Sequence, residues 1–504
     1  MEIVNSILVW AMKKRIHQIE LFIRYPEEVQ NDWFINLISE AKSTHWGKKF
    51  QYNKIKTVAD FKRTVPIQDY NSLKPYIDRA RNGEQDVLWP GETKWFAKSS
   101  GTTEDRSKFV PVTPEALETC HYKGGKDLIS LYIKHKPDSK MFTGRGLVLG
   151  GSQEINKSNP QSYSGDLSSI IIDNLPVWAE LHRTPSKKIA LMAEWEEKLQ
   201  VMAETTAEQN ITTLAGVPSW TLVLLKKVLK IKGVKTIKEV WPNLETYTHG
   251  GVSFVPFKEQ FDEILNLPKI NYMETYSASE GFFGLQDLYG EAFDGGLLLM
   301  LDYGVFYEFI PLENLEDANP KTLGLAEVEL GKHYSLVIST NSGLWRYQIG
   351  DTIMFTSLYP FRIKVTGRTK QHINVFGEEL MVQNAEKAIQ IACEKWNAII
   401  TEFTACPVFM DDTNKGGHEW LMEFSKEPSD MEGFSETFDA TLKMLNSDYE
   451  AKRYKDFVLE FPKVHKMPPG TFYQWMKGRG KLGGQNKVPR LSNTRKYVDE
   501  ILLD

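Results

Sequence analysis

The chain has 504 residues, of which 41% are hydrophobic and 25% are charged, so its composition excludes a disordered protein and supports at least two cores. Its 61 basic and 66 acidic residues give a formal net charge of -5, so no positive field favours nucleic acid or an anionic membrane as a partner. The three cysteines contain no C-x-x-C pair, which argues against a disulfide framework or a zinc site. We therefore expect a multidomain globular protein of the reducing cytosol.

Residues 1–80 are predicted to be mostly helical, because apolar side chains recur at helical spacing, as at Ile16, Ile19 and Phe22. The apolar patch at the N-terminus is short and is followed by Lys13 and Lys14, without a small-residue cleavage site. We interpret it as an amphipathic helix packed on the body of the protein. Contact with a membrane is the minor alternative.

A run of small hydroxyl residues and glycine, SSGTTEDRSK, occupies residues 99–108. Such a run leaves backbone N–H groups uncovered and adds hydroxyl donors, which suits a phosphate group. The alternative is an ordinary solvated loop. Shortly afterwards Thr113 and Pro114 form a helix start signal, and we expect the helix to run to about His135.

The middle of the chain alternates apolar runs with helical segments at 220–229 and 257–265, which indicates an α/β layered fold with a mixed sheet. We expect strands in the apolar runs at 146–151, 168–175 and 295–302, and in the segments 334–340, 344–355 and 361–367. The pattern breaks at Gly367 and Arg368. A helix at 384–395 and a hairpin across 403–424 then indicate a smaller α+β domain. We therefore predict a large mixed-sheet domain, residues 1–365, and a small domain, residues 366–504.

Four further segments carry side chains suited to nucleotide chemistry. They are TYSASEGFFG at 275–284, with Tyr276 and Glu280; LWRYQIGD at 344–351; the segment around Arg368; and KGRGKLGGQNKVPR at 477–490, with Lys487. Each also has an ordinary structural interpretation, as a polar turn, a capping aspartate or a solvated basic loop. The P-loop, the dinucleotide-binding glycine pattern and the nucleophile elbow are absent from the sequence.

Taken in order, these five segments resemble the successive signatures of the adenylate-forming superfamily, which includes acyl-CoA synthetases and luciferases. Within it the chain most resembles bacterial members of the auxin-responsive-promoter family of acyl-acid amido synthetases. This resemblance lies in residues 63–91, in SSGTTEDRSKFVPVT at 99–113, in YSASEG at 276–281 and in NKVPR at 486–490. It spans nearly the whole chain. The chain departs from the plant members at residues 104–106, which replace glycines, and at Gln348, which replaces arginine, with Arg346 two residues earlier.

The resemblance implies a luciferase-like fold, ATP and Mg²⁺ as cofactors, and a two-step reaction. A carboxylic acid would attack the α-phosphate of ATP to form an acyl-adenylate, and an amine, such as an amino acid, would then displace AMP to give an amide. The implied catalytic residues are Lys487, Ser279 and Lys370, with Glu280 as the magnesium ligand. The implied nucleotide-binding residues are Ser99, Ser100, Gly101, Thr102, Thr103, Lys108, Gly250, Gly251, Tyr276, Asp351 and Arg368.

For the acid, we expect contacts with Val217, Trp220 and Phe282, although each is equally well explained as a core residue. Two other functions stay open at this stage. An acyl-CoA synthetase would share the first step and use a thiol as acceptor, and a non-catalytic nucleotide-binding protein would keep only the fold. The expected partners are the two small-molecule substrates, with no nucleic acid and no membrane, and we expect a monomer in the cytoplasm.

Overall fold

The N-terminal part of the chain forms the helices predicted from its apolar spacing. They are α2 (Ile16–Arg24), α3 (Pro26–Ala41), α4 (His45–Lys49), α5 (Val58–Thr64) and α6 (Tyr70–Arg81). Thr57 and Asp69 begin α5 and α6 with capping boxes, which supply partners for the free N–H groups of the first turn. The computed structural model describes residues 10, 15–99, 108–150, 153–155, 162–192, 194–251, 254, 257–315, 317, 319–369, 372–373, 378, 380–409, 416–446, 449–450, 453, 459–482 and 487–503.

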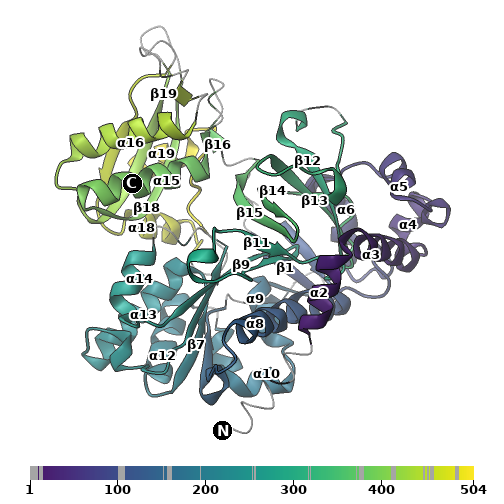
Figure 1. Ribbon diagram of the computed structural model, residues 1–504, viewed down its shortest axis with the longest axis horizontal. Coiled ribbons are helices and arrows are strands. Elements are labelled where there is room, and N and C mark those ends of the chain that lie inside the picture. Colours follow the sequence, from purple (N-terminus) through teal and green to yellow (C-terminus); the bar gives the residue numbers. More distant parts are fainter. Residues whose placement is uncertain are drawn as a thin grey trace.

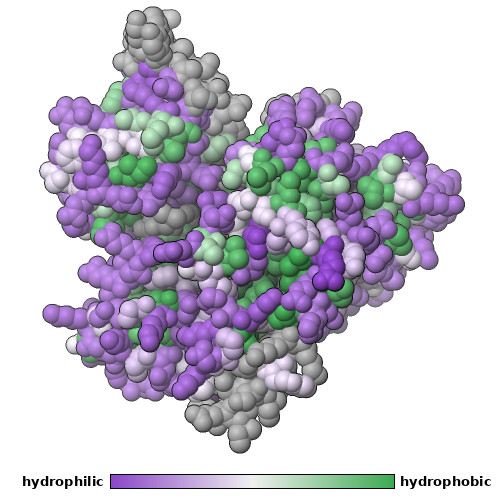
Figure 2. Space-filling view, viewed as in Figure 1, coloured by the Kyte–Doolittle hydropathy of each residue, from purple (hydrophilic) through white to green (hydrophobic). Residues whose placement is uncertain are grey.

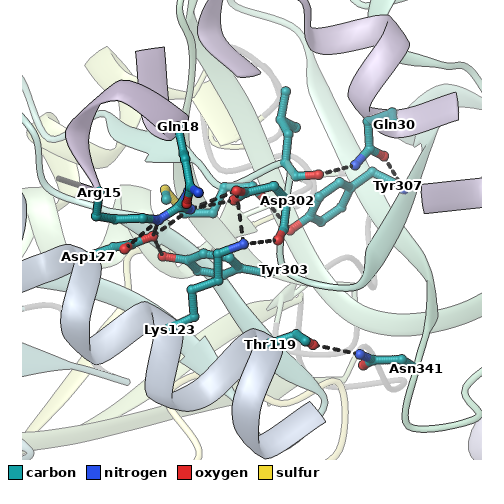
Figure 3. A network of polar contacts seen from close by, with 12 residues as sticks. Arg15, Gln18, Gln30, Thr119, Lys123, Asp127, Asp302, Tyr303, Tyr307 and Asn341 are labelled. Atoms are coloured by element: carbon teal, nitrogen blue, oxygen red, sulfur yellow. Dashed lines mark hydrogen bonds and ion pairs between the residues drawn. The ribbon is translucent and has the colours of Figure 1, made fainter. Parts of the chain in front are cut away.

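A buried polar network ties α2 to the centre of the large domain (Figure 3). The Arg15 guanidinium donates to both carboxylates of Asp127 and Asp302, with Nε 2.8 Å from Asp127 Oδ1 and Nη2 2.7 Å from Asp302 Oδ2. The Tyr303 hydroxyl donates to Asp127, and Lys123 pairs with Asp302 at 2.9 Å. Because Arg15 and Asp127 are almost fully buried, each charge depends on the other for its stability.

The predicted helix after Thr113 is confirmed. The Thr113 side chain accepts a hydrogen bond from the N–H of Ala116 and so caps α7 (Pro114–Ala116). The helix continues through a π-helical turn (Leu117–Tyr122) into α8 (Lys123–His135). Before it, β1 (Trp95–Ser99) and β2 (Lys108–Val112) pair in a sheet with β5 (Tyr163–Gly165) and β4 (Gln153–Ile155).

The large domain is built on a mixed sheet of eleven strands within the described residues. In spatial order these are β12 (Val305–Pro311), β13 (His333–Thr340), β14 (Tyr347–Leu358), β15 (Phe361–Arg368), β11 (Leu297–Leu299), β10 (Gly281–Leu285), β9 (Asn271–Ala278), β8 (Thr246–Gly250), β7 (Ile211–Ala215), β3 (Arg145–Val148) and β6 (Arg183–Thr184). The strands from β6 to β9 are parallel, and the others are antiparallel. The predicted mixed sheet is thus confirmed.

Helices cover the parallel part of this sheet (Figure 1). Those of one layer, α12 (Trp195–Ala207), α13 (Pro218–Lys232) and α14 (Lys258–Leu265), enclose a core around Trp241, Tyr247 and Phe261. A larger core, which includes Phe283 and Trp345, lies between the antiparallel strands and the N-terminal helices. Within the described part of the chain, no helix is both long and apolar enough to cross a bilayer.

The strand predicted at 168–175 is wrong. This segment forms the helix α9 (Leu167–Asp173), followed by α10 (Val177–His182) and α11 (Lys187–Ala190). The β-branched isoleucines favour a strand locally, but Leu167 and Ile170, one helical turn apart, are both buried. Since α9 packs against β1 and β5, tertiary packing decides the conformation here.

The small domain contains a three-stranded sheet and its own core. Its strands are β18 (Ile399–Val408), β19 (Gly417–Lys426) and β20 (Lys463–Met467), preceded by the short β16 (His372–Ile373) and β17 (Leu380–Met381). Its helices are α15 (Val382–Trp396), α16 (Met431–Leu445), α18 (Thr471–Gly478) and α19 (Lys496–Leu503). The predicted helix and hairpin are confirmed, with β18 and β19 antiparallel.

The surface is notched where the small domain meets the rest of the molecule (Figure 2). The last strand of the large sheet, β15, continues to Arg368, and the short strands β16 and β17 follow it. We propose that the two domains meet in the segment 364–370.

Candidate active site

Ser279 and Glu280 form the two-residue loop of a tight hairpin. The strands β9 and β10 are antiparallel and pair up to Ala278 and Gly281, so these two residues alone connect them. Hairpin loops usually lie in solvent, yet both residues are only 8% exposed. The fold therefore encloses a hydroxyl and a carboxyl group at the end of two central strands.

The charges of two basic side chains affect the pKa of the Glu280 carboxyl group. Burial raises its pKa above the usual range, while the positive charges of Lys108 and Arg368 act in the opposite direction. Lys108 stands at the start of β2, directly opposite Ser99 at the end of β1. The start of β2 is thereby placed close to the β9–β10 hairpin, although residues 100–107 separate it from β1 in the sequence.

Asp351 is fixed by two partners from different strands. Asp351 on β14 and Arg368 on β15 are direct partners in the antiparallel register, and Arg368 Nε lies 2.7 Å from Asp351 Oδ1. The Tyr276 hydroxyl donates to the other oxygen, Oδ2, at 2.7 Å. Burial and the charge of Asp351 hold the pKa of Tyr276 well above its usual value, so the phenol stays a donor. Because a carboxylate accepts about four hydrogen bonds, Asp351 keeps acceptor capacity for a diol.

Lys487 reaches from the small domain into the large one. Its ammonium group donates to the carbonyl oxygen of Gly251, just after β8. Gly251 has a φ of +79°, and a Cβ atom there would lie 3.3 Å from Lys487 Nζ, so both the backbone and the lysine favour glycine. Removal of the ammonium group from water lowers the pKa of Lys487 to about 8. The positive charge of Arg368 also lowers it, and the negative charge of Asp351 raises it. The side chain as a whole stays exposed in the cleft.

These residues share one cleft between the two domains, with a volume of about 1410 Å³. The sequence-predicted residues that line it are Trp220, Gly251, Tyr276, Ser279, Glu280, Asp351, Arg368 and Lys487. They come from α13, the β8 end, the β9–β10 hairpin, β14, β15 and the segment after α18. Residues far apart in the sequence thus meet around a space large enough for a nucleotide and a second small molecule.

Three more of the predicted residues, Val217, Gly250 and Phe282, are described but do not line the cleft. Val217 precedes α13 and is 4.0 Å from the position of a Cβ on Gly251. Gly250 packs against the next strand, since a Cβ there would lie 2.5 Å from the carbonyl oxygen of Thr275. Phe282 is part of the core packing rather than of the cleft lining, and its backbone N–H donates to Cys120 Sγ. Their proposed roles toward ligands stay predictions.

Several predicted residues fall outside the described part of the chain. They are Ser100, Gly101, Thr102, Thr103 and Lys370, together with the side chain of Ser99. Arg346, which lies two residues before Gln348, does not line the cleft. Its guanidinium is buried and pairs with Glu308 at 2.9 Å.

Glu280 is the only residue for which we predicted metal binding. No group of three or more His, Cys, Asp or Glu side chains among the described residues could hold a metal ion. A single carboxylate suits an ion that arrives with the phosphates of a nucleotide and keeps most of its own ligands.

Among the polar side chains that line the cleft and that sequence reasoning missed are His249, Gln260 and Glu274. His249 directly precedes Gly250 and Gly251, but a histidine within an apolar strand is most simply a core residue. Burial raises the pKa of the Glu274 carboxyl group, an effect that Lys364 opposes. The register of β8 and β9 pairs His249 with Glu274, and α14 carries Gln260; neither arrangement is visible in the sequence.

Models of one protein family match most of the chain. The GH3 family N-terminal domain matches residues 15–270, the central domain 298–368 and the C-terminal domain 383–496. A putative indole-3-acetic acid-amido synthetase, GH3.9, from Arabidopsis thaliana is 24% identical over 97% of this chain and 95% of its own length.

Two solved structures share the fold of this chain. The GH3.15 acyl acid amido synthetase is 17% identical and has a TM-score of 0.80, covering 98% of this chain and 96% of that one. A 2-hydroxyisobutyryl-CoA ligase in the postadenylation state is 12% identical and has a TM-score of 0.60, covering 94% of this chain and 92% of that one. These likenesses confirm the predicted adenylate-forming fold.

Proposed function

The chain belongs to the GH3 family, and we propose that it is an acyl acid amido synthetase, which activates a carboxylic acid with ATP and joins it to an amino acid or another amine. The observation that supports this function best is the meeting of Glu280, the Asp351–Arg368 pair and Lys487 in one interdomain cleft. A protein that only bound a nucleotide would need neither the buried carboxyl group nor the lysine from the second domain.

In the first step, a carboxylate oxygen of the acid attacks the α-phosphorus of ATP, and the bond to the β-phosphate oxygen breaks to release pyrophosphate. Two anions must approach each other, so positive charge at the point of contact lowers the barrier. Lys487 supplies it, since at pH 7 a group with a pKa of about 8 is mostly protonated. Ser279 donates to the α-phosphate, and Asp351 accepts hydrogen bonds from the ribose.

The β- and γ-phosphates lie, in this proposal, on the loop between β1 and β2, with Lys108 at its end. The Glu280 carboxylate would hold a Mg²⁺ ion that arrives with ATP, and the ion would supply positive charge to the phosphates. Burial disfavours the charged form of Glu280, so a cation bound beside it would stabilise the carboxylate by supplying the opposite charge.

In the second step, the amine nitrogen attacks the acyl carbonyl carbon, and the carbon–oxygen bond to AMP breaks. The nitrogen loses its proton, and AMP leaves as the anion. Lys487 occupies one approach to that carbon, so we propose that the small domain moves about the segment 364–370 between the two steps. The protein forms no covalent intermediate in this scheme.

The test is ATP–pyrophosphate exchange over a panel of carboxylic acids, followed by measurement of AMP release with amino acids or with CoA. Exchange with an acid, and AMP release that depends on an amino acid and yields an amide by mass spectrometry, would support the proposal. Release that depends only on CoA would identify a thioester-forming ligase. ATP binding without exchange for any acid would identify a nucleotide-binding protein.

We also propose that the enzyme works as a monomer in the cytoplasm. Its three cysteines are unpaired, which supports a reducing compartment. The cleft is completed by residues of a single chain, so a second copy is not required for the chemistry.

A further inference from the structure

Helix α6 lies in the segment 63–91, which carries part of the resemblance to the family but has no role in the proposed chemistry so far. It packs against β2, the strand that begins with Lys108. A capping box of Asp69 and Ser72 starts the helix, so the N–H groups of its first turn, which begins at Tyr70, have partners. A well-formed helix thus contacts the strand whose first residue we place beside the outer phosphates of ATP.

Tyr70 contacts the first two residues of β2 in two different ways. Its hydroxyl oxygen accepts a hydrogen bond from the backbone N–H of Phe109 at 2.9 Å. The Lys108 ammonium nitrogen lies over the Tyr70 ring, 5.8 Å from its centroid, which is within the range at which an aromatic ring attracts a cation. One side chain therefore holds the backbone next to Lys108 and also attracts the charge of that lysine.

The other end of α6 contacts Phe109 as well. The Arg81 guanidinium lies over the Phe109 ring, with 3.6 Å between Arg81 Cζ and the ring centroid. Tyr70 and Arg81 are the first and last residues of α6, so both ends of the helix contact the same residue of β2. The position of Phe109, and with it the point from which the Lys108 side chain extends, is therefore set by α6.

The residues before α6 pair with β14, the strand that carries Asp351. Gln68 forms a parallel bridge with Tyr347, with two backbone hydrogen bonds of 2.9 Å to the residues on either side of it. Tyr70 follows Gln68 by two residues. The start of α6 thus connects the strand of the carboxylate that we assign to the ribose with the strand of Lys108.

Lys108 and Tyr70 both lie close to the β9–β10 hairpin. Burial raises the pKa of the Glu280 carboxyl group, and the positive charge of Lys108 opposes that effect. Burial also raises the pKa of Tyr347, and the charges of Glu280 and Tyr70 add to the increase. The contact between Tyr70 and Lys108 is therefore made beside the hairpin to which we assign the phosphates and their metal ion.

We propose that Tyr70 is a positioning residue for Lys108, which it directs toward the β- and γ-phosphates of ATP through its hydrogen bond to Phe109 and the contact of its ring with the ammonium group. The proposal rests on the proposed function, in which the loop between β1 and β2 binds those phosphates. Tyr70 acts through the lysine and does not itself contact a substrate. Because AMP lacks both outer phosphates, Tyr70 should affect the binding of ATP and not that of AMP.

The test measures the dissociation constants of ATP and of AMP by calorimetry, in the native enzyme and in two variants. Tyr70→Phe removes the hydroxyl and keeps the ring, whereas Tyr70→Leu removes both. We expect the dissociation constant of ATP to rise about 2- to 10-fold in Tyr70→Phe, as for the loss of one hydrogen bond, and about 10- to 100-fold in Tyr70→Leu. The dissociation constant of AMP should stay at the native value in both.

A third variant, Lys108→Met, separates a positioning role from a general structural one. In this background there is no ammonium group to direct, so adding Tyr70→Phe should not change the affinity for ATP any further. The matched control is Tyr76→Phe, which removes a hydroxyl of the same helix that accepts a hydrogen bond from Lys49, and it should leave both affinities unchanged. Thermal melting shows whether each variant is folded, and if Tyr70→Leu is not, Tyr70→Phe decides the result.

The outcomes separate this inference from the function on which it rests. Absence of ATP–pyrophosphate exchange with every acid of the panel would contradict the amido synthetase function. An affinity for ATP that Tyr70→Phe leaves unchanged, or equal losses of affinity for ATP and AMP, would overturn the positioning role while the adenylation function stands. An effect of Tyr70→Phe that persists in full in the Lys108→Met background would overturn it too.

Discussion

Replacing Lys487 with alanine tests the central element of the proposed chemistry. In the structure its ammonium group is bonded to the Gly251 carbonyl and lies close enough to Arg368 and Asp351 for both charges to affect its pKa. The variant removes one positively charged donor from the place where the carboxylate and the α-phosphate meet. Loss of one such donor typically lowers the rate by about 10²- to 10³-fold, or about 2.7–4 kcal/mol in the activation free energy.

We expect ATP–pyrophosphate exchange by Lys487→Ala to fall by this factor, with ATP affinity, measured by calorimetry, within a few-fold of native. Binding should change little because the lysine is needed most when the second anion arrives. The matched control is Lys463→Ala, an exposed lysine on β20 of the same domain, which should retain full exchange. Undiminished exchange by Lys487→Ala would remove this residue from the mechanism, and a large loss of ATP affinity would reassign it to nucleotide binding.

Four further predictions concern Glu280, Asp351, the pH dependence of Lys487 and the buried Arg15 network. Glu280→Gln, which keeps the shape but removes the charge, should lower exchange by about 10²-fold and raise the Mg²⁺ concentration needed for half-maximal rate; an unchanged Mg²⁺ dependence would contradict its metal role. Asp351→Asn should raise the dissociation constant of ATP roughly 10- to 100-fold, as expected for hydrogen bonds to a charged group worth about 1.5–3 kcal/mol, and calorimetry would reveal if it does not. Adenylation should decline as the pH rises through about 8, where Lys487 loses its proton, and Lys487→Arg should shift that decline to higher pH; a flat profile would argue against a charged lysine. Asp127→Ala should lower the free energy of unfolding by about 3–5 kcal/mol in urea titrations, because it removes the more deeply buried of the two carboxylate partners of Arg15; a change below 1 kcal/mol would show that Asp302 alone compensates.

Much of the fold was predictable because local patterns and packing agree. The hairpin of β18 and β19 and the run of β13 to β15 have β-branched and aromatic residues in strand-length segments, separated by turns that contain glycine or proline. The exception at 168–175 arises because three isoleucines suit either a strand or a buried helix, and only the packing of α9 against β1 decides between them.

The site was predictable only in part. The sequence indicated Asp351 and Arg368 separately, but their direct pairing depends on the register of β14 and β15. Glu280 is buried although it lies in a two-residue hairpin loop, which the polar sequence did not suggest. His249 and Gln260 were not predicted at all, because nothing in a single sequence distinguishes a polar side chain that lines a cleft from one that is enclosed in the core.

The hydrogen bond between Lys487 and Gly251 joins the two domains through the ammonium group to which we assign a role in adenylation. In this arrangement of the domains, removal of its ammonium group from water lowers the pKa of Lys487, so its positive charge is disfavoured. The phosphates of a nucleotide would supply the missing counter-charge, so nucleotide occupancy and domain closure should each favour the other. The small domain would then move away from the large one more readily in the free enzyme than in the nucleotide-bound enzyme. Substrates would therefore enter the cleft before Lys487 takes its position beside Gly251.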